Sequence, residues 1–544
     1  MPRGTSGMFR FHAILPVLLP LSVFIFAGIA GVDYGRHWDE DEHLHNVRHS
    51  LITQTLLPTG GDTRDGDPRL TTGYYAYPGV IYWTLLISAA PEILHHLRDV
   101  TQPAVTDFIM SEAFHLRARA VFAIVSSLAI LWTYLLVLKI RGTWLEALFA
   151  ASLLAGSWEI SYQSRWVATD TIVMQFGALC LLFCICGLDW PRWKTWARLA
   201  AIAAGFAAGT KYPGAILLLP VCLVAWIRAA DSAGGTSRGV RWVIAAQLCL
   251  IGCVAFLVTT PGAVLQPWAF YDWLYYESHL YSAGTHHGYT VSGHLDHLWK
   301  IFVYESIVLF SHQPVIAGAV FVLAVVGAIA VCRQDLKLGT VLLIFPVVYV
   351  PYFMVQQLMI VRNLMVLSPF IAIFAARGMA LAMEQISKPA LKWTFVGAAT
   401  AAVAFNLGFT VYAAMTIREA GASMNYDLAG LRDYINDHPK TRFDLSPQTA
   451  DYLRQFDPDA AAHINLGETT REVVVVCSWE GNNLLQWPAN QWDLAAETFG
   501  PYDVNFNYYP TWWRNRIVMI DFNRAMTLPV DGVREIVKAR DRQK

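Results

Sequence analysis

The densest group of residues able to do acid–base chemistry is Asp39-Glu40-Asp41-Glu42-His43, shortly after the first apolar segment. On a helix, Asp39 lies four residues and Glu40 three residues before His43, so these side chains would share one face. Carboxylates beside a histidine suit a general base or a metal site. Acidic residues are also favoured in the first turn of a helix by its dipole, which leaves a structural interpretation open.

A second acidic candidate is Asp170, at the start of a later apolar segment, with Arg165 shortly before it. Asp170 or its neighbour Thr169 would serve as a helix N-cap, but capping does not account for the arginine. Lys211 lies in a tight turn between two apolar segments, and Arg362 opens another. Both side chains can hold a phosphate at the level of a lipid head group. Snorkelling of long basic side chains to the membrane interface is the alternative.

The polar stretch Pro261–His297 is rich in aromatic and histidine residues and also contains Glu277. Its aromatic rings could stack on a sugar or form an interfacial belt. A metal site is the weaker interpretation, because the spacing fits no closed zinc pattern among His286, His287, His294, Asp296 and His297. The sequence therefore assigns no metal ligand and leaves the cofactor open, with a divalent cation as one option.

The elements that must position these residues are membrane helices. Hydrophobic residues make up 55% of the chain and charged residues only 15%, outside the range of ordinary soluble domains. The apolar residues form blocks of roughly 18–24, long enough to cross a bilayer core. Such blocks include Ala13–Ile29, Val121–Leu138, Thr171–Gly187, Ile244–Val258, Val315–Val331, Val341–Val355 and Phe395–Tyr412. The net charge of −1 and the lack of a Lys/Arg run exclude a nucleic-acid partner.

The positive-inside rule assigns the sides of the membrane. Arg3 and Arg10 place the N-terminus in the cytoplasm, and the segment Tyr74–Leu94 decides the parity of everything downstream. We expect that segment to lie juxtamembrane, because Pro78 and Pro91 bend or end helices. The remaining basic loops then fall in the cytoplasm, and about eleven spans result. Compact loops and the lack of a retention signal favour a bacterial inner membrane over the endoplasmic reticulum.

The chain divides by composition after Tyr412. Residues 1–414 form the predicted membrane domain, in which 33–116 is the first external loop with its juxtamembrane helices. Residues 415–544 form a predicted small extracytoplasmic α/β domain. Its signals are a strand at Glu472–Cys477 and a helix at Asp427–His438. The predicted fold class is therefore an α-helical polytopic membrane protein with a small C-terminal α/β domain.

Several short motifs occur in a recognisable order between the first span and about Arg377. They are Asp39-Glu40-x-x-His43-Leu44 after the first span, Tyr74-Tyr75-x-Tyr77-Pro78, Arg117 and Arg119, Asp170, Gly209-Thr210-Lys211-Tyr212, and Arg362 ahead of Pro369. In this order the chain resembles the GT-C superfamily of polyprenyl-phosphate-sugar glycosyltransferases. The similar branch contains the protein O-mannosyltransferases and lipid A aminoarabinose transferase. Two departures are Pro78-Gly79-Val80 in place of Pro-Pro-Leu, and Arg362-Asn363 in place of Arg-Tyr.

The resemblance implies roles for the candidate residues in an inverting sugar transfer to an acceptor hydroxyl on the extracytoplasmic face. Asp39 would be the general base, with Glu40 and Asp170 orienting it or the acceptor. The residues expected at the donor phosphate are Lys211, Arg362, Arg117 and Arg119. Those expected at the sugar or acceptor are His43, Tyr77, Arg165, Tyr212, Glu277 and His286. The partners would be a polyprenyl-phosphate-linked sugar and an acceptor glycan, lipid or protein.

Three other classes of protein remain alternatives to this interpretation. A membrane transporter of a small polar solute also carries charges at membrane depth, but transporters usually show internal repeats and broken helices, and no repeat is apparent here. An accessory subunit with a decayed site is disfavoured by the intact Asp39-Glu40 pair. A metal-dependent phosphotransferase or hydrolase would use the same carboxylates and histidines.

Overall fold

The structure of this protein is a computed structural model of the 544-residue chain. It describes residues 15–33, 38–58, 73–141, 143–231, 237–283 and 291–419, and farther on residues 432, 436–437 and four strands. The chain divides into two compact units. The larger one comprises Met1–Ile29, Asp41–Thr285 and Thr290–Ala413, and the smaller one Ala30–Glu40, His286–Tyr289 and Ala414–Lys544. The domain division at 414/415 stays a prediction.

Among the described residues, eight helices are long and apolar enough to cross a membrane. They are α6 (Glu112–Arg141), α9 (Asp170–Asp189), η4 with α11 (Tyr212–Leu217 and Leu218–Asp231), α12 (Arg238–Thr259), α16 (Pro314–Gln334), α17 (Leu336–Met354), η5 with α18 (Val361–Leu367 and Ser368–Gln385) and α19 (Pro389–Glu419). Three shorter helices accompany them: α1 (Leu18–Ile29, preceded by η2, Leu15–Val17), α7 (Trp144–Ala155) and α10 (Trp193–Ala208). Over its described residues, each apolar block named from the sequence is almost entirely helical. The total of about eleven spans stays a prediction.

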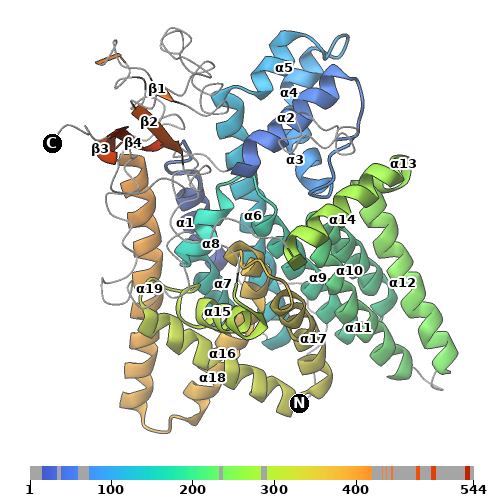
Figure 1. Ribbon diagram of the computed structural model, residues 1–544. Helices are drawn as coiled ribbons and strands as arrows, with labels where there is room; N and C mark the ends of the chain where they lie inside the picture. The colour runs from blue at the N-terminus through green and yellow to red at the C-terminus, as the bar shows by residue number, and fades with distance from the viewer. Residues whose placement is uncertain are drawn as a thin grey trace. The chain divides into compact units, whose positions relative to one another are not determined.

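Helices α9 and α18 form the centre of the helical bundle and are buried over most of their length. α9 packs on α6 and α10, and α18 packs on α16 and α7 (Figure 1). α18 and α16 approach each other closely at two glycines. A Cβ on Gly378 would overlap the Leu323 carbonyl, and a Cβ on Gly327 would overlap the Phe374 carbonyl. Small residues allow such close approach of membrane helices. α19, in contrast, is mostly exposed.

The segment that decided the predicted topology does not form one spanning helix. It breaks into α3 (Val80–Ser88) and α4 (Ala90–His95), and a nine-residue helix is only about 14 Å long. With α2 (Trp38–Ile52) and α5 (Pro103–Ile109), these helices lie over the first half of α6 in Figure 1. A shared apolar core that includes Val47, Leu85 and Phe114 holds the group together. The juxtamembrane position of Tyr74–Leu94 stays a prediction.

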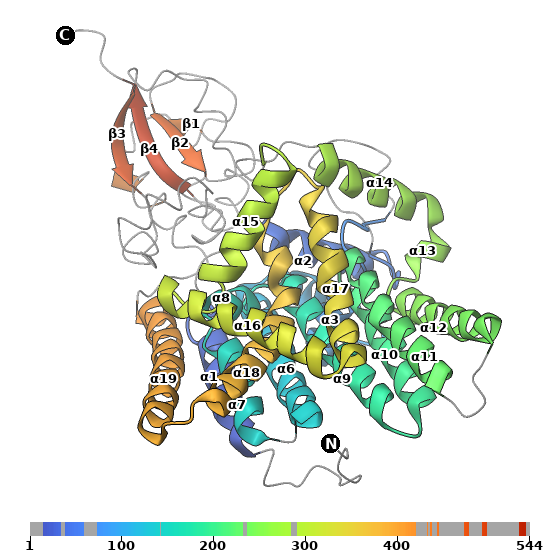
Figure 2. The same cartoon turned by 90° about the horizontal axis from the view of Figure 1, so that it is seen from below.

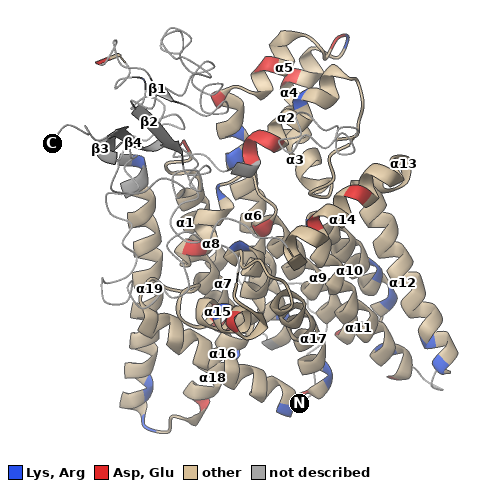
Figure 3. Ribbon diagram, in the orientation of Figure 1, with Lys and Arg blue, Asp and Glu red and all other residues tan. Residues whose placement is uncertain are grey.

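The polar stretch after α12 is also helical. It forms α13 (Gly262–Leu265), α14 (Pro267–Ala283) and α15 (His294–Ile307), and Figure 2 shows α14 running between α13 and α15. Figure 3 shows Asp and Glu on α2, α5 and α14 at one end of the bundle, and Lys and Arg where α12 begins and where α18 connects to α19 at the other. Which end faces the cytoplasm stays a prediction.

The C-terminal unit contains a four-stranded sheet in the order β1-β2-β4-β3, formed by β1 (Phe443–Asp444), β2 (Val473–Cys477), β3 (Trp492–Glu497) and β4 (Val533–Ala539). β1 pairs with β2 in parallel, and β4 pairs antiparallel with both β2 and β3. The β-branched run at Glu472–Cys477 therefore forms a strand, as expected. The predicted helix Asp427–His438 lies almost entirely outside the described residues.

Candidate functional site

Asp170 is the first residue of α9, yet it does not act as a helix cap. The cap position is Thr169, which makes no side-chain capping bond. The Asp170 carboxylate instead accepts a 2.6 Å hydrogen bond from Nζ of Lys211 and lies 3.5 Å from Nε of Arg362, the latter contact through its other oxygen. Asp170 is only 2% exposed. A carboxylate this buried needs such charged partners, so the structure favours an ion cluster over the capping interpretation.

Lys211 reaches Asp170 from the turn between α10 and η4. Its backbone is extended, and its N–H donates to the Ala207 carbonyl, which fixes the turn on the end of α10. Besides the bond to Asp170, Nζ donates to Oδ1 of Asn363. Only 12% of the Lys211 side chain is exposed. Snorkelling to the interface therefore does not describe this lysine, because its charge is held inside the protein.

Asn363, which was recognised from the sequence only as a departure from the family's motif, belongs to the same cluster. It follows Arg362 in η5, and both residues are buried. Tyr349 of α17 donates a 2.7 Å hydrogen bond to the Asn363 carbonyl, and the Asn363 amide nitrogen lies 3.5 Å from the Tyr281 hydroxyl of α14. The Asp170 cluster, as we name it, thus consists of Asp170, Lys211, Arg362, Asn363, Tyr281 and Tyr349.

The aromatic segment before α3 is bonded to the turn that carries Lys211. Tyr212 donates a 2.6 Å hydrogen bond to the Tyr75 carbonyl, and the Val80 N–H donates to the Gly209 carbonyl at 2.8 Å. A Cβ on Gly79 would overlap the Thr259 carbonyl at the end of α12. The departure at Gly79 therefore has a physical reason, since a bulkier residue would not fit there. Tyr212 connects the cluster's turn with the juxtamembrane segment.

His43 and Tyr77 are brought together, as the sequence suggested. Their ring centroids lie 4.9 Å apart at a steep angle, and Tyr74 lies 6.4 Å from His43 on another side. Glu277 of α14 is close enough to Tyr212 and Tyr281 to interact electrostatically with both. Glu277 therefore lies beside the Asp170 cluster. The described ring contacts of His43 are with Tyr74 and Tyr77 of the aromatic segment.

The Asp39-Glu40 pair lies in the first turn of α2, so the predicted helical spacing to His43 holds. Glu40 is buried, and both residues are part of the smaller compact unit. The side chain of Asp39 lies outside the described residues, as does His286. Their roles stay predictions.

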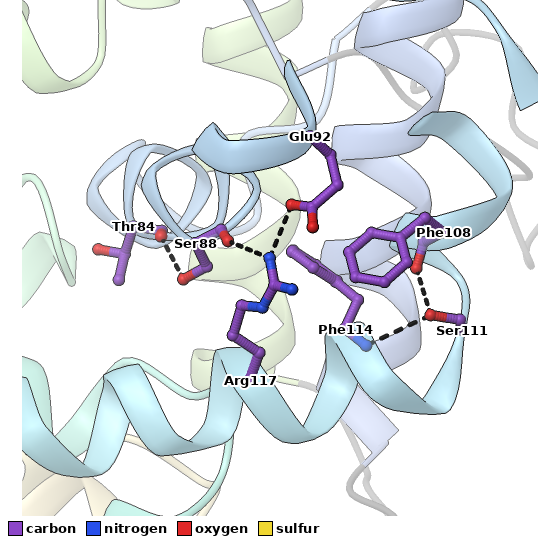
Figure 4. Close-up of polar contacts among 7 residues, drawn as sticks. All are labelled: Thr84, Ser88, Glu92, Phe108, Ser111, Phe114 and Arg117. Carbon is purple, nitrogen blue, oxygen red and sulfur yellow. Dashed lines mark hydrogen bonds and ion pairs between the residues drawn. The ribbon is translucent and has the colours of Figure 1, made fainter. Parts of the chain in front are cut away.

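Arg117, which the resemblance places at the donor phosphate, makes its described contacts away from the cluster. Its Nη1 donates to Glu92 at 2.6 Å and to the Ser88 carbonyl at 3.4 Å, and its guanidinium lies 5.1 Å from the centroid of Phe108 (Figure 4). These contacts tie α3, α4 and α5 to α6. Arg117 therefore has a structural role in this part of the fold, and its role at the donor phosphate stays a prediction.

The other two arginines are fully buried in the region before α9. Arg119 lies over the Trp166 ring at 4.6 Å. Arg165 donates a 2.9 Å hydrogen bond to the Ala27 carbonyl at the end of α1 and lies over the rings of Trp158 and Tyr162. These contacts lie at the segment between α8 (Trp158–Ser164) and α9, a position suited to fixing the start of α9 at Asp170.

Within the described part of the chain, no group of three or more His, Cys, Asp or Glu side chains could hold a metal ion. His294 and His297, two members of the weaker zinc hypothesis, have their Nδ1 atoms bonded to the carbonyls of Met354 and Gln356. Asp296 accepts hydrogen bonds from Ser292 and pairs with Lys300. His294 and His297 thus connect α15 to the end of α17. Asp296 connects the first turn of α15 to Ser292, just before the helix, and to Lys300.

Sequence reasoning missed three members of the cluster. Tyr281 was noted only as one aromatic among many, and Asn363 only as a mismatch. Tyr349 carries a hydroxyl in the middle of an apolar block, which is a signal that could have found it, because a buried tyrosine hydroxyl usually has a hydrogen-bond partner.

Comparison with known proteins supports the same interpretation. A family model described as dolichyl-phosphate-mannose-protein mannosyltransferase matches residues 106–265, which include Asp170 and Lys211. The structure of ArnT from Cupriavidus metallidurans bound to undecaprenyl phosphate is similar, with 13% identity, coverage of 89% of this chain and 96% of that chain, and a TM-score of 0.53. The apo structure of that protein matches with 13% identity over 96% and 97% of the two chains and a TM-score of 0.51. No curated protein sequence matches the chain.

The family match over residues 106–265 and the likeness in fold to ArnT agree with the resemblance to the GT-C superfamily. The predicted fold class, a helical multi-pass membrane protein of the GT-C kind, is confirmed by that likeness in fold.

Proposed function

We propose that this protein is a membrane glycosyltransferase that moves a sugar from a polyprenyl-phosphate donor to an acceptor hydroxyl on the extracytoplasmic face. The observation that carries the proposal is the meeting of Lys211 and Arg362 at the Asp170 carboxylate. Lysine and arginine side chains bind phosphate groups through charge-assisted hydrogen bonds. The family match over residues 106–265 and a fold like that of ArnT, which has been seen with undecaprenyl phosphate bound, support this assignment.

The proposed reaction is a single inverting displacement. The acceptor oxygen forms a bond to the anomeric carbon while the bond from that carbon to the phosphate oxygen breaks, and the phosphate keeps the electron pair. Asp39 takes the proton of the acceptor hydroxyl, a contribution typically worth about 10²–10⁴ in rate. Lys211 and Arg362 stabilise the charge that grows on the leaving phosphate. Asp170 holds the two cations in place, and Glu40 orients the base or the acceptor.

Other residues would shape the sugar and acceptor region. The imidazole of His43 and the phenol of Tyr77 lie beside each other. Tyr212 and Glu277 lie next to the Asp170 cluster. The acceptor is a glycan, a lipid or a protein, and the membrane is a bacterial inner membrane with the N-terminus in the cytoplasm.

The experiment that tests the role of Asp39 compares Asp39→Asn with Asp107→Asn in purified enzyme. Asp107 is an exposed carboxylate on α5 that pairs with Arg48 at 3.3 Å, so its variant controls for the loss of a charge. We expect Asp39→Asn to lower sugar transfer about 10²-fold or more and Asp107→Asn to leave it near the wild-type rate. The anomeric configuration of the product reports on inversion. Near-wild-type turnover of Asp39→Asn would show that another group takes the proton.

A further inference from the structure

Tyr281 of α14 brings a hydroxyl group to the Asp170 cluster. No other residue of the cluster lies on this helix. Near the end of α14, its carbonyl accepts a 2.7 Å hydrogen bond from the Gln357 N–H, in the segment between α17 and η5. Two turns earlier in that helix, Nε1 of Trp273 donates to the Gly73 carbonyl at 2.5 Å. α14 is therefore held at two points, Trp273 and Tyr281, which fixes the position of the Tyr281 hydroxyl.

That hydroxyl has a hydrogen to donate. Its one contact among the described residues is with the Asn363 amide nitrogen, a donor, at 3.5 Å, so the phenol oxygen accepts and its own hydrogen has no acceptor there. The loss of hydration and then the Glu277 carboxylate raise the pKa of Tyr281. The phenol therefore stays protonated at neutral pH and remains a donor.

Lys211 has a hydrogen to spare beside it. An ammonium group has three N–H donors, and Nζ of Lys211 uses two of them, one on Asp170 and one on Asn363. Asn363 bridges the two groups, because its oxygen accepts from Lys211 and its nitrogen approaches Tyr281. Tyr281 is also close enough to Arg362 and Asp170 to interact electrostatically with each. The Tyr281 hydroxyl and the third N–H of Lys211 thus lie on either side of the Asn363 amide, and Arg362 is close by.

We propose that Tyr281 is a positioning residue of the donor-phosphate site, whose hydroxyl and the third N–H of Lys211 both donate to the phosphate group. This inference rests on the proposed function and deepens it. Donor binding then depends on the docking of α14 against the juxtamembrane segment and the end of α17.

The test measures the affinity of the full-length protein in lipid nanodiscs for undecaprenyl phosphate, by thermophoresis, for the wild type and for Tyr281→Phe. Tyr275→Phe is the matched control, because Tyr275 lies on the same helix with 62% exposure and stacks on Tyr271 and His279. A hydrogen bond to a charged group is worth enough to change affinity about 10-fold or more. We expect that loss for Tyr281→Phe and none for Tyr275→Phe, with unchanged melting midpoints for the unliganded proteins.

Competition by inorganic phosphate separates the phosphate group from the lipid chain. The proposal predicts that Tyr281→Phe also weakens competition by inorganic phosphate. Unchanged competition alongside a loss for undecaprenyl phosphate would assign Tyr281 to the lipid chain and overturn the proposal, as would equal affinities of variant and wild type. An affinity loss accompanied by a lower melting midpoint would mean a packing role and would overturn it as well. A wild type that binds no undecaprenyl phosphate would instead contradict the proposed function itself.

Discussion

Lys211 and Asp170 lie 41 residues apart in the chain, and the Nζ atom of the lysine donates a 2.6 Å hydrogen bond to Oδ1 of the aspartate. Arg362 approaches the second carboxylate oxygen from η5. A buried ion pair of this kind is weak evidence for a gain in stability, because removing two charges from water costs as much as their attraction returns. Its retention in a membrane bundle therefore points to function.

Replacing the lysine tests that conclusion. Lys211→Met removes the cation that bonds to Asp170, and we expect kcat/KM for the donor to fall about 10²–10³-fold. Lys337→Met is the control, because Lys337 forms a largely exposed pair with Asp231 at the end of α11 and exposed pairs contribute little. Steady-state kinetics with a polyprenyl-phosphate sugar measures both. Equal activities of the two variants would remove Lys211 from the site.

The Arg117–Glu92 pair, by contrast, serves the fold. With side-chain exposures of 38% and 22%, we expect Arg117→Met and Glu92→Gln each to cost about 1 kcal/mol or less and to keep turnover within a few-fold of the wild type. A double-mutant cycle on the melting midpoint measures the pair. A loss of turnover from Arg117→Met as large as that from Lys211→Met would return Arg117 to the donor-phosphate site.

Gly79 offers a test of the connection between the juxtamembrane segment and the cluster's turn. Gly79→Ala would drive a Cβ into the Thr259 carbonyl, so we expect a lower melting midpoint and reduced turnover, with overpacking of this kind costing about 1–3 kcal/mol. Gly408→Ala is the control, because a Cβ on Gly408 in α19 meets no atom within 4 Å. In a helix that change should be neutral or slightly stabilising. Equal melting midpoints of the two variants would contradict the close packing at Gly79.

A buried carboxyl group on α8 (Trp158–Ser164) makes stability depend on pH. Burial raises the pKa of Glu159 from 4.5 to about 8, although the Tyr304 hydroxyl at 3.3 Å opposes the shift. Below pH 4.5 the group is neutral in both the folded and the unfolded chain. As the pH rises toward about 8, the unfolded chain loses this proton while the folded chain keeps it, so stability falls across that window.

We therefore expect Glu159→Gln to raise the melting midpoint at pH 8 and to leave it nearly unchanged at pH 4.5, with a gain of about 2 kcal/mol or more at the higher pH. Glu112→Gln, at an exposed position at the start of α6, serves as control. Melting curves of the detergent-purified proteins across this range supply the comparison. If Glu159→Gln shows the same fall with pH as the wild type, Glu159 is not the group responsible.

The sequence predicted the parts of this site well and their assembly poorly. Apolar blocks identified the spans because a helix that faces lipid needs an unbroken apolar run. Asp170, Lys211 and Arg362 were each found as charges at the edge of a span, where a charge needs a reason. Lys211 and Arg362 meet at the Asp170 carboxylate because of the way in which α9, α10 and α18 pack. The spacing of residues along the chain does not predict that packing.

The ion pair of Arg117 could not be predicted for the same reason. Its helix was identified, but its partner Glu92 lies on α4, in a segment expected only to be juxtamembrane. Asn363 and Tyr281 illustrate the opposite case. Asn363, a departure from the family's motif, and Tyr281, one of many aromatic residues, are 82 residues apart in the chain and are neighbours in the cluster. Local pattern identifies which residues are costly, and tertiary packing decides which of them act together.

The most direct test of the account is sugar transfer by the purified protein from a panel of polyprenyl-phosphate sugars, with the polyprenyl phosphate product measured together with the transferred or released sugar. The account predicts turnover of one donor, which would also identify the sugar, and loss of that turnover in Lys211→Met. Turnover of no donor, together with specific binding of a soluble solute, would contradict it and favour a transporter.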